Sequence, residues 1–158
     1  MAKEIERKFL VSGDEWKDLA EAGTRLTQAY IMGGPDRSLR VRIFNDQSAR
    51  LTIKIGTAAM TRDEYEYDIP IDDAREMAEH ATGVIIDKTR YRLPDGDFVW
   101  EIDVFHGAHA GLIVAEVELP DEDTQPAFPE WLGREVTGDN RYLNHTLSTT
   151  GGVPEETE

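Results

Sequence analysis

Charged side chains recur in this chain as pairs of like charge separated by one residue. Four pairs are acidic and two are basic: Glu4/Glu6, Glu64/Glu66, Glu101/Asp103 and Glu116/Glu118, then Arg40/Arg42 and Lys88/Arg90. On a β-strand, side chains two residues apart point to the same face and lie about 7 Å from each other. Two like charges at that distance repel by roughly 2.4 kcal/mol at an effective dielectric constant of about 20. A surface that only had to be soluble would mix the signs, so these pairs indicate a site that holds ions of both signs.

The two sets of charges have complementary chemistry. Cationic side chains bind phosphate oxygens, arginine through a bidentate fork and lysine as a point charge. The cationic set is Lys8, Arg40, Arg42, Lys54, Lys88 and Arg90. Carboxylates are the hard oxygen ligands that Mg²⁺ and Mn²⁺ prefer. A metal held by two or three of them could bridge to phosphate oxygens, orient an attacking water and lower the pKa of that water.

β-Strands must position these pairs, because the dominant pattern along the chain is an alternation of period two. Eight strands are predicted at about 3–11, 25–32, 38–44, 49–55, 62–69, 84–92, 98–105 and 112–120. Short links at 33–36, 45–48, 94–97 and 106–111 favour antiparallel neighbours. One interpretation is an ordinary half-buried sheet with its charged face in water. The alternative is a sheet that closes with the charged face inward, and eight strands are enough for a barrel.

Three helices are predicted beside the strands. The first follows a capping box at Ser12–Glu15, the second is capped by Asp72, and the third is capped by Thr137. Their apolar sides could cover part of the outer face of a barrel. The predicted fold class is therefore α+β: an eight-stranded antiparallel sheet or β-barrel with flanking helices.

Composition limits the class of protein. Lys and Arg total 17 against 32 Asp and Glu in 158 residues, and the formal charge of −15 argues against a nucleic-acid binder. Cysteine is absent, which excludes disulfides, thiol nucleophiles and cysteine-ligated metals. No apolar run would serve as a signal peptide or membrane span, so a soluble, cytoplasmic protein is expected. Residues 1–150 are expected to form one domain, and 151–158 an acidic disordered tail.

Histidines and tryptophans give weaker indications. His106 and His109 lie three residues apart in a small-residue loop, and we expect surface residues there rather than metal ligands, because a site needs three or four converging ligands. Trp16, Trp100 and Trp131 are expected to pack on the outer face rather than to stack on nucleobases.

The ordered pattern of charged pairs resembles the CYTH family, also called triphosphate tunnel metalloenzymes, in its short bacterial single-domain form. Glu4-Ile5-Glu6-Arg7-Lys8 matches the E-x-E-x-K signature of that family near the N-terminus. Its companions follow in order: Gln28-Ala29-Tyr30, Arg40-Val41-Arg42, Lys54, Glu64-Tyr65-Glu66, Lys88-Thr89-Arg90, Glu101-Ile102-Asp103, Glu116-Val117-Glu118 and the segment from Trp131 to Tyr142. The resemblance runs from about residue 2 to residue 150.

The resemblance implies a charged tunnel in which a metal-dependent attack splits a triphosphate. It implies that the cationic set named above holds the phosphates. It also implies one or two Mg²⁺ or Mn²⁺ ions at Glu4, Glu6, Asp103, Glu116 and Glu118, with Glu64, Glu66 and Glu101 as supporting acidic residues. The catalytic residues would be Tyr30 and Lys88. A phenol ionises only at high pH, so Tyr30 needs a nearby Lys or Arg to act as a base, and the alternative is an orienting hydrogen bond to a lysine.

Hydrolysis of inorganic tripolyphosphate to pyrophosphate and phosphate is the first hypothesis, because the short chain has no evident element that would recognise a nucleobase. The same scaffold could serve a nucleoside or thiamine triphosphatase, or a class IV adenylate cyclase. A non-enzymatic alternative is a polyphosphate-binding module, although a pure anion trap gains nothing from carboxylate pairs. The expected partner is a small-molecule triphosphate, with neither nucleic acid nor membrane, bound by a monomer or homodimer.

Overall fold

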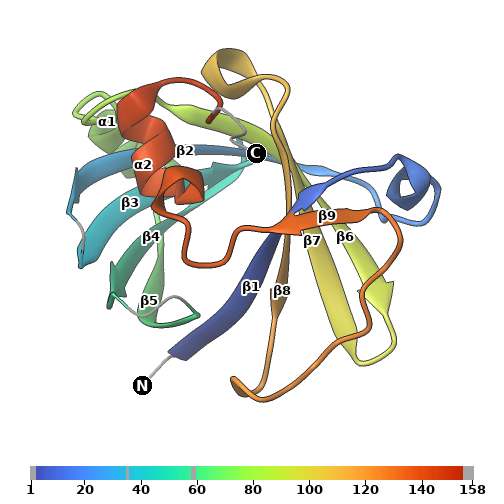
Figure 1. Ribbon diagram of the computed structural model, residues 1–158. Coiled ribbons are helices and arrows are strands. Elements are labelled where there is room, and N and C mark those ends of the chain that lie inside the picture. Colours follow the sequence, from blue (N-terminus) through green and yellow to red (C-terminus); the bar gives the residue numbers. More distant parts are fainter. Residues whose placement is uncertain (1–2, 35, 58–59, 155–158) are drawn as a thin grey trace.

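The computed structural model describes residues 3–34, 36–57 and 60–154 as a closed antiparallel barrel (Figure 1). Its strands are β1 (Lys3–Val11), β2 (Thr24–Gly33), β3 (Arg37–Phe44), β4 (Ser48–Ile55), β5 (Thr61–Ile69), β6 (Ile86–Asp95), β7 (Phe98–Phe105), β8 (Ile113–Glu118) and β9 (Leu132–Glu135). They pair in the order β5-β4-β3-β2-β6-β7-β8-β1-β9, and a further β5–β1 pairing closes the ring. The predicted eight-stranded antiparallel barrel is confirmed, and the short β9 is an addition that the sequence analysis did not predict.

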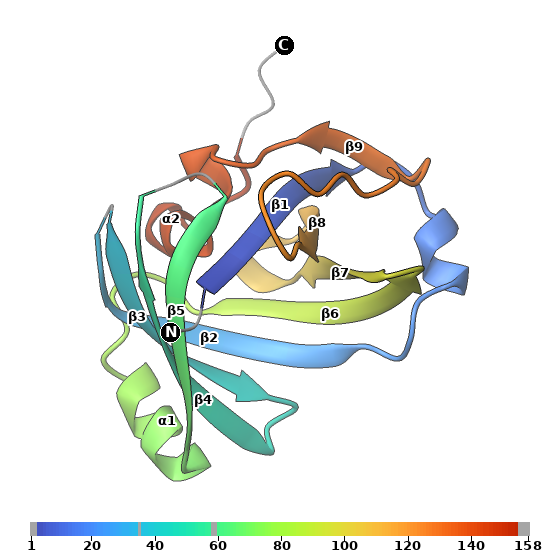
Figure 2. The same ribbon diagram turned by 90° about the horizontal axis from the view of Figure 1, so that it is seen from below.

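Closure of the barrel is uneven along β1. One edge of β1 pairs with β8 over Glu6–Leu10. The other edge pairs with β5 only over Lys3–Ile5, and further along with β9 at Phe9 and Val11. Strands β5 and β1 therefore separate beyond their short seam, and the chain after β9 passes beside the gap (Figure 2). Val136 N donates to Lys8 O at 2.8 Å and fixes that passage.

The predicted first helix is wrong in extent. The structure has only the 3₁₀ turn η1 (Glu15–Asp18), and the side chain at its N-cap, Asp14, makes no capping hydrogen bond. The turn nevertheless buries Trp16 against the barrel. Burial of this one indole, rather than the capping box, holds the segment in place.

The predicted caps of the other two helices are also wrong. Helix α1 (Ile71–Ala78) begins after Pro70, whose fixed φ suits a helix start, and Asp72 lies in its first turn. Thr137 does not begin a helix; its hydroxyl accepts a hydrogen bond from Lys8 N at 2.9 Å. The third helical region instead consists of η3 (Asn140–Tyr142) and α2 (Asn144–Thr150).

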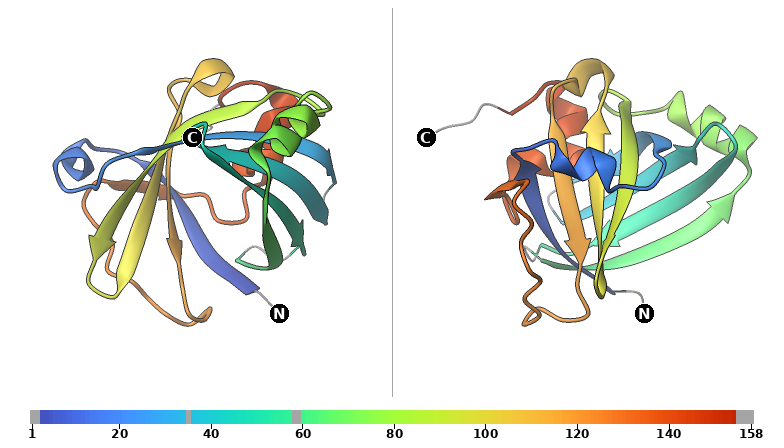
Figure 3. Two further views of the ribbon diagram at one scale, coloured as in Figure 1. Left: turned by 180° about the vertical axis from the view of Figure 1, so that it is seen from behind. Right: turned by 90° about the vertical axis from the view of Figure 1, so that its right-hand side faces the viewer.

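The outer face of the barrel is apolar and covered, as the alternation of the strands requires. Trp16, Trp100 and Trp131 are buried in one cluster on the outer side of β1, β6, β7 and β8, which confirms their predicted packing role. The rings of Trp100 and Trp131 meet edge to face, with centroids 5.6 Å apart. Helix α1 covers β2, β3 and β4 through the buried Ala74 (Figure 3).

Helix α2 packs across one end of the barrel interior. Its Leu147 is buried among Tyr30, Ile86, Phe105 and Val114. Ile86 and Val114 lie on the same faces of their strands as the charged pairs of β6 and β8, so the lumen changes from charged to apolar at this end. The C-terminal helix thus covers an apolar end of the lumen.

The histidine prediction is wrong for His109, which lies at the end of η2 (Gly107–His109) and is fully buried. A ring Nε2 contact of 2.6 Å with Leu147 O ties η2 to α2. His106 Nε2 lies 2.8 Å from Thr89 Oγ1. The helices among the described residues are too short and too polar to cross a bilayer. Of the predicted tail, residues 151–154 are coil, and 155–158 lie outside the described residues, as does residue 35 of the predicted link at 33–36.

Candidate active site

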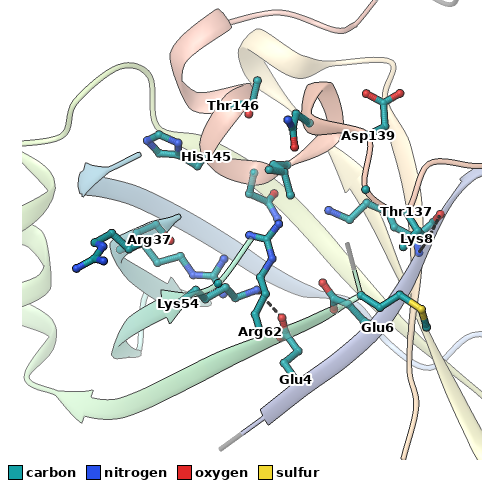
Figure 4. A pocket seen from close by; sticks show the side chains of 18 of the residues that line it. Glu4, Glu6, Lys8, Arg37, Lys54, Arg62, Thr137, Asp139, His145 and Thr146 are labelled. Atoms are coloured by element: carbon teal, nitrogen blue, oxygen red, sulfur yellow. Dashed lines mark hydrogen bonds and ion pairs between the residues drawn. The ribbon is translucent and has the colours of Figure 1, made fainter. Parts of the chain in front are cut away.

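The barrel interior contains two adjoining cavities. The first, of about 320 Å³, is lined by β1, the ends of β3 and β5, the chain after β9 and the start of α2, and is called here the α2-side cavity (Figure 4). The second, of about 340 Å³, opens near the starts of β2 and β4 and is called the opposite cavity. Both are lined by Glu4, Glu6, Arg40, Lys54 and Asn144. These five residues therefore mark the junction of one continuous charged region.

Thirteen of the fifteen predicted site residues line these cavities. In the α2-side cavity are Glu4, Glu6, Lys8, Tyr30, Arg40 and Lys54. The opposite cavity adds Arg42, Glu64, Glu66, Arg90, Glu101, Glu116 and Glu118. The remaining two, Lys88 and Asp103, are buried behind the wall and contact each other. Residues from all eight barrel strands thus meet in the lumen, because alternation sends the charged face of each strand inward.

Lys54 connects two carboxylates at the junction. Its Nζ donates to Glu4 Oε1 at 2.9 Å and lies 3.5 Å from Glu64 Oε2. Burial raises the pKa of Glu4, and Lys54 offsets part of that effect. Lys54 itself is desolvated and repelled by Arg40, but Glu6, Glu4 and Glu64 leave its pKa above the ordinary value. A phosphate could therefore compete with these carboxylates for Lys54, and a cation could compete with Lys54 for the carboxylates.

Glu6 and Glu116 are close enough to oppose each other. Burial raises the pKa of Glu6 to about 8, and the negative charge of Glu116 adds to the effect. Burial also disfavours the charge of Glu116, but Lys8 and Arg90 outweigh it and hold the pKa of Glu116 well below its usual range. Lys8 Nζ lies 3.5 Å from Glu116 Oε1. Glu116 therefore has its own counter-ion, whereas Glu6 lacks enough positive charge around it.

Arg90 is held in a fixed orientation. Its Nε and Nη2 donate to the two oxygens of Asp103 at 2.8 and 3.0 Å. Its Nη1 lies 3.4 Å from Glu101 Oε2 in the opposite cavity. Burial opposes the charge of Asp103, but Arg90 and Lys88 lower the pKa of that carboxyl to about 2. Asp103 thus acts as an anchor that turns the remaining edge of Arg90 toward the cavity.

Arg40 and Arg42 form the cationic wall on β3. Arg42 Nε donates to Gln28 Oε1 at 2.7 Å, and burial together with the charges of Arg40 and Arg90 lowers the pKa of Arg42 to about 9. Arg40 Nη1 donates to the hydroxyl of Tyr30 at 3.5 Å. The partner of Tyr30 is thus an arginine rather than the lysine considered in the sequence analysis.

Carboxylates are the donor set that the cavities offer to a metal. Glu4, Glu6, Glu116 and Glu118 all line the opposite cavity. The raised pKa of Glu6 indicates a buried carboxylate that lacks positive charge, which a divalent cation would supply. Among the described residues, no three acidic or histidine side chains are already gathered into a metal site. The donor chemistry fits Mg²⁺ or Mn²⁺, and the carboxylates would have to draw together around the ion.

A model of the CYTH domain matches residues 2–149 of this chain. The chain belongs to the CYTH domain family. A protein of Acetivibrio thermocellus named inorganic triphosphatase is 49% identical over 148 residues, which are 93% of this chain and 94% of that protein. A protein of Nitrosomonas europaea with the same name is 36% identical over 149 residues, which are 92% of this chain and 96% of that protein.

A solved structure shows the same fold over nearly the whole chain. A crystal structure described as that of an inorganic triphosphatase superposes with a TM-score of 0.66 at 32% sequence identity. The alignment covers 98% of this chain and 99% of that one.

The residues that line the cavities and were missed as site residues by the sequence analysis include Arg37, Arg62, Asn144 and His145. Arg62 shares its strand face with Glu64 and Glu66, so alternation could have found it, but it forms no pair of like charge. Asn144 and His145 lie at the start of α2, and no pattern in the sequence places that helix against the barrel interior.

Proposed function

We propose that this protein is a metal-dependent inorganic triphosphatase that hydrolyses tripolyphosphate to pyrophosphate and phosphate. The observation that carries the proposal is the convergence of the predicted cations and carboxylates on two adjoining cavities inside a closed barrel. The likeness to two curated inorganic triphosphatases over more than nine-tenths of the chain supports it.

The lining of the cavities favours an inorganic substrate over a nucleotide. Among their described lining residues, the only rings are those of Tyr30, Phe44 and His145. Tyr30 is buried and packs edge to face on His145, with centroids 5.1 Å apart. A nucleobase would need an exposed ring or matched hydrogen-bond groups to hold it, whereas the rest of the lining is dominated by charges suited to phosphate oxygens.

Five cations of the predicted set line the cavities, and we assign them to the phosphate chain: Lys8, Arg40, Arg42, Lys54 and Arg90. Lys88 is the exception, because it is fully buried and its Nζ is occupied by Asp103 at 2.8 Å and Asn144 Oδ1 at 3.2 Å. We therefore assign Lys88 to the support of Asp103, and Asp103 to the orientation of Arg90. Binding and orientation of this kind account for most of the catalysis in phosphoryl transfer.

The metal is assigned to Glu4, Glu6, Glu116 and Glu118. Asp103, the fifth ligand that the resemblance implies, would first have to release Arg90 and Lys88. When bound, Mg²⁺ or Mn²⁺ polarises phosphoryl oxygens and makes a water nucleophilic at neutral pH.

Tyr30 is assigned as the group that accepts the proton of the attacking water. Tyr30 lines the α2-side cavity, and its hydroxyl accepts a hydrogen bond from Arg40 Nη1. The guanidinium of Arg40 carries donors only, so it cannot itself take the proton. Burial of the ring against α2 fixes the hydroxyl with respect to the cavity.

A panel of triphosphates tests the substrate. The full chain is incubated with Mg²⁺ and, separately, with tripolyphosphate, ATP, GTP or thiamine triphosphate, while phosphate, pyrophosphate and cyclic AMP are quantified. The proposal expects tripolyphosphate to give the highest kcat/KM, with pyrophosphate and phosphate formed in equal amounts. A higher kcat/KM for a nucleotide, or cyclic AMP from ATP, would contradict it. Tight binding of tripolyphosphate without turnover would point instead to a binding module.

A further inference from the structure

The two cavities differ in the charge of their unshared walls. Beyond the shared residues, the α2-side cavity has three cations, Lys8, Arg37 and Arg62, against one carboxylate, Asp139. The unshared wall of the opposite cavity has four arginines against five glutamates. In a chain with a formal charge of −15, the α2-side cavity is therefore the end at which an anion meets an attractive field.

Three of the four unshared arginines of the opposite cavity are paired with carboxylates, and the fourth, Arg42, donates to Gln28 Oε1. Arg50 Nε lies 3.1 Å from Asp68, and Arg50 Nη1 lies 3.5 Å from Glu66. Arg92 lies 3.4 Å from Glu21. Arg90 is held by Asp103. These three arginines have counter-ions within the protein, and the surplus glutamates at this end suit a divalent cation.

Arg62 differs from these arginines in its surroundings. It lies opposite Glu4 in the β1–β5 register, but Glu4 is bound by Lys54 at 2.9 Å. No carboxylate within the described ranges forms an ion pair with Arg62, whose side chain is half-buried. Figure 4 shows the side chain rising beside Glu4 into the α2-side cavity. Arg37, at the rim, pairs with its exposed neighbour Asp36, at 3.0 Å.

A half-buried guanidinium without a counter-ion requires an anion to compensate the loss of water. Its planar fork matches two oxygens of one phosphate group. We infer that the triphosphate enters the barrel through the α2-side cavity and that Arg62 is a further substrate-binding residue, which holds the phosphate group nearest the opening, with Arg37 attracting the anion at the rim. This inference rests on the proposed function. It adds the end of the barrel at which the substrate enters and one further substrate-binding residue.

Two substitutions with the same change in net charge test the inference. Arg62→Gln removes the unpaired arginine, and Arg92→Gln removes an arginine from the rim of the opposite cavity. Loss of one charge-assisted phosphate contact weakens binding on the order of tenfold. We expect Arg62→Gln to raise KM for tripolyphosphate about tenfold with kcat within about twofold of the parent, and Arg92→Gln to leave both within about twofold. Equal KM values for the two variants, or a larger rise in Arg92→Gln, would overturn the inference.

Ionic strength provides an independent measurement. Steering of an anion by exposed arginines is screened by salt. We expect kcat/KM of the parent to fall more steeply with added KCl than that of an Arg37→Gln, Arg62→Gln double variant. Identical salt dependence of parent and double variant would contradict entry at this end.

Direct binding separates failure of the inference from failure of the proposed function. Tripolyphosphate is titrated calorimetrically into parent, Arg62→Gln and Arg92→Gln without divalent metal, with melting temperatures recorded to confirm folding. An inactive parent whose binding is weakened by Arg62→Gln alone would refute the triphosphatase and keep the anion site. An active parent whose binding is unaffected by Arg62→Gln would refute only the inference.

Discussion

Lys88 Nζ lies 2.8 Å from Asp103 Oδ2 in a pair that is almost entirely shielded from solvent, with side-chain exposures of 0% and 2%. Burial lowers the pKa of Lys88 to about 7, although Asp103 favours its charged form. Arg90 binds the same carboxylate at 2.8 Å, so one buried anion serves two cations behind the cavity wall.

Removing Lys88 should cost stability. Lys88→Met leaves Asp103 with Arg90 alone, and loss of one partner from a buried pair destabilises by on the order of 3 kcal/mol. Urea unfolding followed by circular dichroism measures the change. The matched control is Lys3→Met, because Lys3 pairs with Asp63 at 3.5 Å with 53% of its side chain exposed, and exposed pairs contribute below about 1 kcal/mol. Equal losses in the two variants would contradict the structural role of Lys88.

Metal affinity should rise with pH up to about 8. The pKa of Glu6 is raised to about 8, so below that pH the side chain is mainly protonated and neutral. A metal ligand must be ionised, so binding releases this proton and the affinity should fall by about tenfold per pH unit below 8. Calorimetric titration of Mn²⁺ between pH 6 and 9 measures the slope. Glu6→Gln is expected to bind more weakly and with a shallower slope, whereas a pH-independent affinity in the parent would refute the assignment of Glu6.

Tyr30→Phe separates the two roles considered for Tyr30. A proton acceptor contributes on the order of 10²–10⁴-fold to the rate, and an orienting hydrogen bond contributes much less. We expect kcat for tripolyphosphate to fall at least about 100-fold with KM nearly unchanged, because the hydroxyl touches Arg40 and the ring stays packed against α2. A fall below about tenfold would leave Tyr30 as an orienting residue only.

Leu147 should anchor α2 to the barrel. The side chain is fully buried in the apolar end of the lumen, so Leu147→Ala is expected to destabilise the protein by about 2–5 kcal/mol through lost burial and a residual cavity. Thermal unfolding of Leu147→Ala and Leu19→Ala compares the same substitution at a buried site and at one with 66% exposure. The account fails at this point if Leu147→Ala is as stable as Leu19→Ala.

The alternation of polar and apolar residues predicts most of the barrel and the membership of its lumen. It predicts that Arg40 and Glu116 both point into the lumen, because the apolar face of each strand must pack on the outside of the barrel. Alternation cannot tell that Lys88 and Asp103 neutralise each other, since that depends on the register Lys88↔Phe105 and Arg90↔Asp103 between β6 and β7.

The segments outside the barrel were harder to predict, because their positions depend on tertiary contacts. Strand β9 has only four residues, too few for a period to be recognised. Thr137 has the residue type of a helix cap, yet its hydroxyl instead accepts a hydrogen bond from the backbone N–H of Lys8. His109 lies in a loop of small residues typical of a surface, and contacts with Leu147 of α2 and with the ring of Phe105 bury it.

Glu6→Ala tests the central claim most directly. Glu6 lies at the junction of the two cavities and is assigned as a metal ligand, so its removal should abolish the release of phosphate from tripolyphosphate with Mg²⁺. The fold should survive, since loss of a buried carboxylate short of positive charge costs little, and the far-ultraviolet circular dichroism spectrum should match that of the parent. The account predicts an active parent and an inactive, folded Glu6→Ala. A folded Glu6→Ala that hydrolyses tripolyphosphate at the parent rate would contradict it.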